Sequence, residues 1–139
     1  MDTQEMMALR SVAGRIALVT GAASGMGRAT ARLLAAMGAK VAVTDFNGPG
    51  AQMVAQDIVS SGGIAQPWAL DVADRERVAT VVAEAAGAFG GLDIVVNNAG
   101  ISNALPFDDP QYEEAWQRLI AVIMTGTQQV TRAALPWLR

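Results

Sequence analysis

Three glycines in the segment TGAASGMG, residues 20 to 27, have the spacing of a turn that can hold a phosphate. The segment follows the apolar run IALV at residues 16 to 19 and precedes a helical pattern, so it would join a strand to the first turn of a helix. Gly21 would allow the sharp turn, and Gly25 and Gly27 would let the backbone approach a pyrophosphate and the sheet. Free N–H groups and the positive end of the helix dipole would face the anion. The alternative interpretation of the glycines is an ordinary tight turn.

An acidic residue ends the next apolar segment. Asp45 closes VAVTD and lies 18 residues beyond Gly27, near the spacing expected of a carboxylate that binds ribose hydroxyls. A carboxylate there would accept both adenosine ribose hydroxyls and repel a 2′-phosphate, which favours NAD over NADP. Phe46 follows, and no Arg or Lys lies between Gly21 and Gly27, so the sequence places no cation to neutralise an additional phosphate. The alternative interpretation of Asp45 is a turn aspartate before Asn47.

A third segment of interest, NNAG at residues 97 to 100, follows the apolar run DIVV. Ligands of open α/β folds bind at the carboxyl edge of the sheet, where this segment would lie. Ala99 and Gly100 would leave room for a ribose. A plain turn of the Asn-Gly type is the alternative.

Alternating strands and helices must position these segments, and the sequence predicts an α/β fold with a doubly wound parallel sheet. Two of the strand-like runs, IALV and the IVV of DIVV, are continuously apolar, which is typical of central strands covered on both faces. We expect a Rossmann-like sheet truncated to about four strands, in the order three-two-one-four, and a long C-terminal helix. The expected strands are Arg15 to Thr20, Lys40 to Asp45, Ala65 to Leu70 and Leu92 to Asn97, and the expected helices are about Gly25 to Met37, Gly50 to Ser61, Asp74 to Phe89 and Gln111 to Trp137.

The three motifs TGxxxGxG, Asp71-Val72 and NNAG stand in the order and spacing of the short-chain dehydrogenase/reductase family, which the chain resembles from Gly14 onward. The resemblance implies that the glycine loop binds the NAD(P) pyrophosphate, that Asp45 selects NAD and that Asp71 contacts the adenine. It also implies that Asn97 holds neighbouring strands together through its amide. The cofactor-binding residues expected on these grounds are Gly21, Ser24, Gly25, Met26, Gly27, Asp45, Phe46, Asp71, Val72, Asn98, Ala99 and Gly100.

The resemblance also implies a reaction, hydride transfer between nicotinamide and an alcohol or carbonyl, that needs a Tyr, a Lys and a Ser from a region beyond this chain's last helix. The only tyrosine here, Tyr112, is followed four residues later by Trp116 rather than Lys, and we interpret it as a packing residue. The only lysine, Lys40, begins a strand whose six residues span roughly 20 Å, so it would lie at the edge opposite the cofactor.

An Asn that the family carries on the last helix is replaced by Ile123, whose side chain cannot hold the water of a proton relay. Ser102 has no base to activate it, and we expect Asp108 and Asp109 to cap the last helix. We therefore assign no catalytic residue and expect the chain to be inactive or weakly active by itself.

Composition narrows the remaining chemistry. The chain of 139 residues has no Cys and no His, which excludes disulfides, thiol catalysis and the usual zinc sites, and we expect no metal. A net charge of -3 without a basic cluster argues against nucleic acid, and no window suggests a membrane span. We expect a cytoplasmic protein with a loose lead-in at residues 1 to 13 and one dinucleotide-binding domain at residues 14 to 139 that lacks the family's catalytic part.

The last helix carries more apolar residues than one sheet face can cover. They are Tyr112, Ala115, Trp116, Leu119, Ile120, Val122, Ile123, Met124 and Val130. We expect a homodimer or higher homo-oligomer through the helix at 111 to 137, and a contribution from the strand at 92 to 97, which would lie at the sheet edge of so short a chain. Two functions stay open: the NAD(H)-binding part of an oxidoreductase of this family, and a non-catalytic NAD-binding or self-associating scaffold module.

Overall fold

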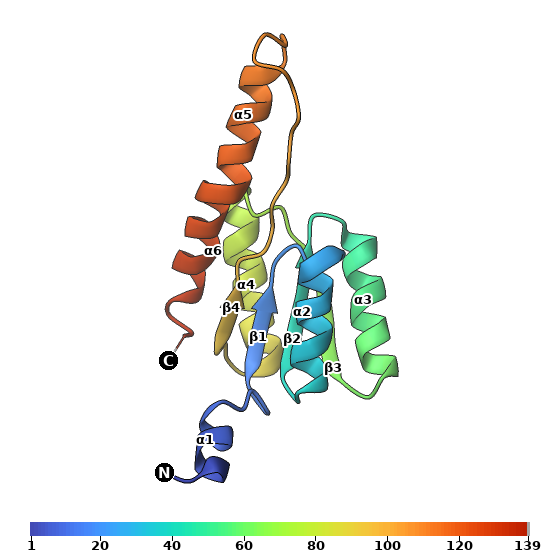
Figure 1. Cartoon of the computed structure of the whole chain (residues 1–139), viewed down its shortest axis with the longest axis vertical. Coiled ribbons are helices and arrows are strands. Elements are labelled where there is room, and N and C mark those ends of the chain that lie inside the picture. Colours follow the sequence, from blue (N-terminus) through green and yellow to red (C-terminus); the bar gives the residue numbers. More distant parts are fainter. Residues whose placement is uncertain (139) are drawn as a thin grey trace.

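Four parallel strands form one sheet, in the order β3-β2-β1-β4, in the computed structural model, which describes residues 1–138 (Figure 1). The strands are β1 (Ile16–Val19), β2 (Lys40–Asp45), β3 (Ile64–Ala69) and β4 (Ile94–Val96). In the register, Ala17 of β1 lies between Val41 of β2 and Ile94 of β4. The predicted fold class and strand order are confirmed.

Helices cover both faces of the sheet. The helices that the structure describes are α1 (Thr3–Leu9), which lies apart from the sheet, and α2 (Gly25–Ala36), α3 (Gly48–Ser60), α4 (Arg75–Phe89), α5 (Tyr112–Ile120), the π-helix η1 (Ala121–Thr125) and α6 (Gly126–Ala134). Alternate strand residues supply the two cores, since Leu18 packs with α4 and α6 and Val19 packs with α2 and α3. This arrangement brings the carboxyl ends of all four strands to one edge of the sheet.

In the part of the chain that the structure describes, the fourth strand lies at an edge of the sheet, as the predicted order implies, and not at its centre, as its apolar run suggested. All four residues of β1 are buried, whereas the three residues of β4 are half-buried. Within the described residues β4 pairs with β1 alone and is an edge of the sheet. A continuous apolar run therefore marks β4 correctly as a strand that helices cover, but it does not reveal how many neighbours the strand has.

The N-terminal lead-in contains a helix that the sequence analysis did not predict. The Asp2 carboxylate accepts a hydrogen bond from the Glu5 N–H at 2.8 Å, and the Glu5 carboxylate accepts one from the Asp2 N–H at 2.8 Å. This capping box begins α1, none of whose residues is buried. The helix is thus held by local hydrogen bonds and does not pack on the sheet (Figure 1).

The predicted long C-terminal helix is confirmed over residues 112–134, with one π-helical turn inside it. The five residues of η1 form a π-helical turn between α5 and α6, and within it the Ile123 carbonyl accepts a hydrogen bond from the Thr127 hydroxyl at 2.7 Å. The backbone comes close to Val72 just after this turn, because a Cβ on Gly126 would lie 2.6 Å from Val72 Cγ2. Neither α5 nor α6, nor any other helix within residues 1–138, has the length and apolar character needed to cross a membrane.

Candidate functional site

The glycine loop after β1 is shaped by backbone conformations that favour glycine. Gly21 and Gly25 have φ angles of +63° and +55°, in the left-handed region. Gly27 has no such angle, but it is buried, and a Cβ there would overlap the Gly21 carbonyl oxygen and the Asn98 side-chain amide. A Cβ on Gly25 would instead enter open space. The loop is therefore tightly packed beneath and open above.

Helix α2 begins at this loop with its first N–H groups directed away from the helix body. Ser24 is the N-cap residue, and its side chain makes no capping hydrogen bond within the described residues. The first bond of the helix runs from the Arg28 N–H to the Ser24 carbonyl at 3.1 Å. The N–H groups before Arg28 have no acceptor inside an ideal helix, so they can donate to an anion.

Asp45, at the end of β2, holds the loop from the side. One carboxylate oxygen accepts the Ala23 N–H at 2.9 Å, and the other accepts the Asn47 N–H at 2.8 Å. Asp45 thus makes the contact with Asn47 that is expected of a turn aspartate, and it also bonds to the glycine loop through Ala23. Each carboxylate oxygen has a second lone-pair site, so the side chain retains capacity for ribose hydroxyls.

Asn98, rather than Asn97, ties the strands together. The Asn98 side-chain amide donates to the Thr20 and Gly21 carbonyls, both at 3.1 Å, while Asn97 donates to the Thr131 hydroxyl of α6 at 3.0 Å. The buried Thr20 hydroxyl accepts the N–H groups of Asn98 and Ala99 at 3.0 and 2.9 Å. The role expected for Asn97 was therefore wrong, because the chain direction after β4 aims the second amide, not the first, at the loop.

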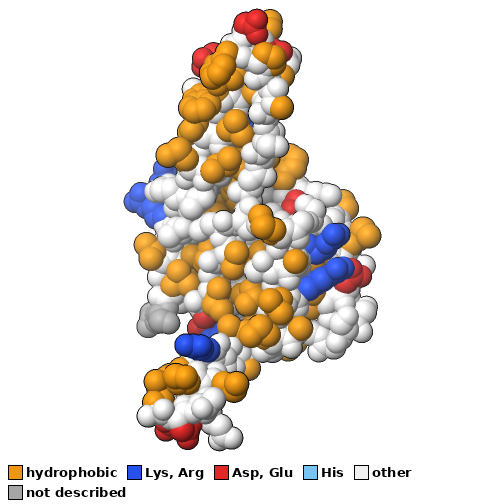
Figure 2. All heavy atoms as spheres, in the orientation of Figure 1, with side chains coloured by type: hydrophobic (Ala, Val, Ile, Leu, Met, Phe, Trp, Pro, Cys, Tyr) orange, Lys and Arg blue, Asp and Glu red, His pale blue; other side chains and the backbone are white. Residues whose placement is uncertain are grey.

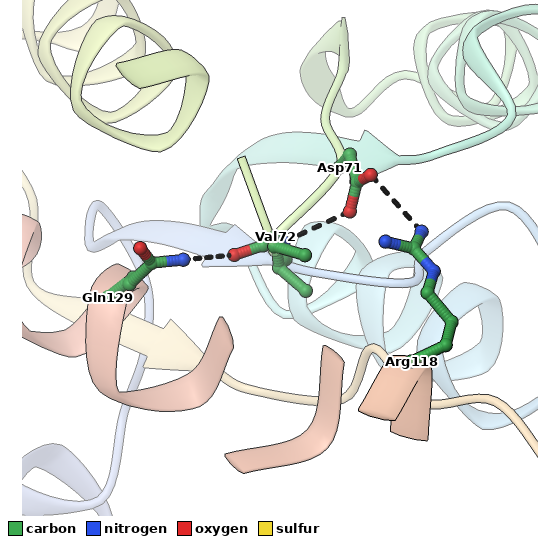
Figure 3. A network of polar contacts seen from close by, with 5 residues as sticks. Asp71, Val72, Arg118 and Gln129 are labelled. Carbon is green, nitrogen blue, oxygen red and sulfur yellow. Dashed lines mark hydrogen bonds and ion pairs between the residues drawn. The ribbon is translucent and has the colours of Figure 1, made fainter. Parts of the chain in front are cut away.

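Asp71 and Val72, just beyond β3, are held by the last helices (Figure 3). Asp71 accepts the Ala73 N–H at 3.0 Å and the Arg118 guanidinium at 3.1 Å. The Val72 carbonyl accepts the Gln129 side-chain amide at 2.9 Å. These bonds connect the end of β3 to α5 and α6, which lie 47 and 57 residues further along the sequence at the bonded positions.

Arg118 is the residue that the sequence analysis missed. Its guanidinium carbon lies 6.0 Å from the centre of the Phe46 ring, so the fold brings a cation near Phe46 that the sequence did not indicate. The helical spacing could have placed Arg118 on the cleft side of its helix, because Arg118 precedes Val122 by four residues and shares its helix face. The spacing indicates which face of the helix carries Arg118, but it does not indicate that Asp71 is the residue it contacts.

One cleft of about 460 Å³ collects eleven of the twelve predicted cofactor-binding residues. It is lined by Gly21, Ser24, Gly25, Met26, Asp45, Phe46, Asp71, Val72, Asn98, Ala99 and Gly100, together with Leu70, Ile101, Arg118 and Val122. The twelfth, Gly27, lies beneath the loop against Gly21 and Asn98. The cleft follows the carboxyl ends of the strands, from Asp71 after β3 to Gly100 after β4.

The remaining polar candidates do not gather into a catalytic group. The Tyr112 ring packs on the Phe107 ring, with 5.0 Å between the ring centres. Lys40 is the first residue of β2, and Asp45, in the cleft, is the last. Ile123 lies in η1 with 44% of its surface exposed, and Ser102, one residue beyond Ile101, does not line the cleft.

The predicted caps of the last helix were misplaced. The N-cap residue of α5 is Gln111, and its side chain makes no capping bond within the described part of the chain. Asp109 accepts the Gln111 N–H at 2.8 Å and so shapes the turn before the helix. Asp108 is not the cap either.

Comparison with known proteins gives consistent matches. The family model described as short chain dehydrogenase matches residues 15–139. The chain is 38% identical to D-threitol dehydrogenase of Mycolicibacterium smegmatis over 82% of its own length and 44% of that protein. It is 43% identical to cis-4-hydroxycyclohexanecarboxylate dehydrogenase of Sinomonas cyclohexanicum over 88% of its length and 49% of that protein.

Solved structures agree with this match. A short-chain type dehydrogenase/reductase from Mycobacterium marinum superposes with a TM-score of 0.87 at 35% identity, over 94% of this chain and 53% of that one. Hydroxysteroid dehydrogenase from Escherichia coli superposes with a TM-score of 0.84 at 30% identity, over 90% of this chain and 52% of that one. The chain spans about half the length of these relatives.

Proposed function

This chain belongs to the short-chain dehydrogenase family, and we propose that it is the NAD(H)-binding part of an oxidoreductase of that family. The observation that carries the proposal is the single cleft in which the glycine loop, the β2 carboxylate and the NNAG segment meet. These three segments come from distant parts of the sequence, yet they line one continuous surface. Their order across the sheet, after β2, β1 and β4, suits a dinucleotide laid over the strand ends.

Each part of the cleft fits one part of the cofactor. The N–H groups at the start of α2 and the open space above Gly25 suit a pyrophosphate. Asp45 suits the adenosine ribose, Asp71 the adenine, and the backbone from Asn98 to Gly100 the nicotinamide riboside. When bound, the nicotinamide would supply or accept a hydride, and the protein residues would orient it.

Preference for NAD over NADP follows from the charge near the ribose. Asp45 is half-buried and already fixed by two backbone N–H groups, so its carboxylate cannot easily turn away from a 2′-phosphate. Arg118 is the cation that could offset this repulsion, but its guanidinium is paired with Asp71. We therefore keep NAD as the proposed cofactor.

The proposal includes weak or absent hydride transfer by these 139 residues alone. The single tyrosine packs on Phe107, and the single lysine begins β2, about 17 Å from the Asp45 end at about 3.3 Å per residue. A phenol and an ammonium so placed cannot share a proton path. The substrate of the whole protein is not assigned.

Calorimetric titration with NAD and NADP tests the cofactor proposal. We expect the unaltered chain to bind NAD more tightly, and Asp45→Ala to weaken NAD by about tenfold, as expected for the loss of hydrogen bonds to a charged group. Asp45→Asn retains an acceptor for the Ala23 N–H and separates the loop contact from the charge. Asp57→Ala, which removes an exposed carboxylate from α3, is the matched control. Absence of binding to both nucleotides would overturn the proposal.

Self-association is a second part of the proposal. Hydrophobic side chains follow the projecting helix α5 in Figure 2, and Trp116 and Met124 expose 47% and 64% of their surface. Burial of this face and of the β4 edge would favour a homodimer or higher homo-oligomer. Because self-association needs no catalytic residue, a non-catalytic scaffold module stays the second candidate function. Light scattering at micromolar concentration should give a multiple of the chain mass, and a single-chain mass would contradict self-association.

The cytoplasmic location stays a prediction from the sequence.

A further inference from the structure

We infer that Arg118 is a specificity residue for the base of the nucleotide, an inference that rests on the proposed function. In the structure the Arg118 guanidinium donates to Asp71 (Figure 3), and its central carbon lies 6.0 Å from the centre of the Phe46 ring. It positions the Asp71 carboxylate to receive the exocyclic amine of a purine. With Phe46 it also forms the wall against which the flat ring rests.

The order of the strands locates the base. Asp71 follows β3, Asp45 ends β2 and the glycine loop follows β1, so these groups lie in that order along the sheet edge. A nucleotide with its pyrophosphate on the loop and its ribose on Asp45 therefore extends its base toward the end of β3. The polar and aromatic side chains that line the cleft there are Phe46, Asp71 and Arg118.

The Asp71 carboxylate is fixed yet retains capacity. One oxygen accepts the Ala73 N–H and the other accepts the Arg118 guanidinium, which uses two of about four lone-pair sites. An amine can therefore join without breaking either bond. Arg118 donates to the second oxygen from a planar group, and it therefore helps to orient the plane of the carboxylate.

The energy of the ion pair itself does not explain the arrangement. The side chains of Arg118 and Asp71 are 44% and 29% exposed, and pairs so exposed to solvent contribute little to stability. The structural role of Arg118 is therefore small, and its removal should change recognition more than folding. This difference makes the inference testable.

Phe46 supplies the second surface. Its ring is 73% exposed, and the 6.0 Å separation from Arg118 is at the outer limit of a cation–π contact, so the two groups are only loosely joined. A purine brought to this end of the cleft would cover the exposed ring and offer its own face to the guanidinium. Lysine at position 118 would keep the charge but lack the planar group.

Two dinucleotides that differ at one substituent provide the test. NAD carries an amine on its purine, and nicotinamide hypoxanthine dinucleotide carries a carbonyl oxygen at the same carbon. We expect the unaltered chain to prefer NAD in calorimetric titrations. Arg118→Ala should weaken NAD by about fivefold, the effect of losing one pre-ordered side chain, and should reduce the preference for the amine because Asp71 is then free to turn.

Two further variants make the result specific. Arg118→Lys retains the charge and the aliphatic stem, and we expect its NAD affinity and its preference to fall between those of the unaltered chain and Arg118→Ala. Arg132→Ala removes an arginine from α6 that lines a different cleft, and it should change neither quantity. The melting temperatures of all three variants should agree closely with that of the unaltered chain. If Arg118→Ala does not fold, the comparison of Arg118→Lys with the unaltered chain provides the test.

Each outcome decides a different point. If the unaltered chain binds neither dinucleotide, the proposed function fails and this inference fails with it. If the chain binds NAD but both Arg118 variants keep the same preference for the amine, the inference alone is overturned. An equal loss for both dinucleotides would show a purely structural role and would also overturn it.

Discussion

The cleft has two walls of different construction. One wall, made by the glycine loop and the strand ends, consists of backbone and short side chains, and the buried Thr20 hydroxyl and the Asn98 amide hold it together. The other wall, made by α5 and η1, presents longer side chains such as Arg118, and neighbouring residues such as Ile123 are partly exposed. The first wall should tolerate almost no change in volume, whereas the second should accept substitutions with little effect on folding.

The largest effect should come from Gly27→Ala in the first wall. The added methyl would overlap the Gly21 carbonyl oxygen, which is backbone, and the Asn98 side-chain amide, which two hydrogen bonds to the loop hold in place. We expect a loss of about 3 kcal/mol in the free energy of unfolding, at the upper end for an overpacked core. Urea denaturation followed by circular dichroism measures it.

Gly87→Ala is the matched control for that substitution. Gly87 lies in α4, and a Cβ there would meet nothing within 4 Å. Alanine in an open helix position should raise stability by about 0.5–1 kcal/mol. Equal effects at residues 27 and 87 would show that the loop wall is not tightly packed.

A smaller effect, about 2 kcal/mol, should follow Thr20→Val, since one buried donor left without a partner costs about 1–3 kcal/mol. Valine keeps the shape but leaves the Ala99 N–H without its acceptor, whereas the Asn98 N–H keeps its bond to the Val96 carbonyl. The same denaturation experiment applies, with Thr80→Val as control, because the Thr80 hydroxyl is exposed and bonds only within its own helix. A neutral Thr20→Val would mean that water replaces the hydroxyl and that this wall is looser than its hydrogen bonds indicate.

The contrast between the walls also explains what the sequence could predict. The strands and the glycine loop depend on local features, namely apolar runs and glycines at fixed spacing, and the strand order follows from the few topologies that right-handed crossovers allow. That Asn98 rather than Asn97 joins the strand ends was not predictable, because two identical neighbours differ only in the direction that the backbone gives each side chain.

The second wall was harder to predict because its contacts are long-range. Arg118 meets Asp71 across 47 residues of sequence, and no local pattern announces that pair. The π-helical turn at η1 also escaped prediction, since apolar periodicity does not distinguish it from a regular helix. The site was thus predictable where the backbone makes it and unpredictable where side chains from the last helix complete it.

The smallest effect should come from Ile123→Asn in the second wall. With 44% of Ile123 exposed and similar helix propensities for the two residues, we expect the free energy of unfolding to change by no more than about 0.5 kcal/mol. The substitution supplies the amide that the family resemblance implies at this position. Because the only tyrosine and the only lysine of the chain lie apart from the cleft, it should produce no measurable NADH from NAD and a panel of secondary alcohols. Turnover that appears only in Ile123→Asn would mean that a single amide completes a proton path within these 139 residues, and the helix wall would then be a catalytic surface rather than a permissive one.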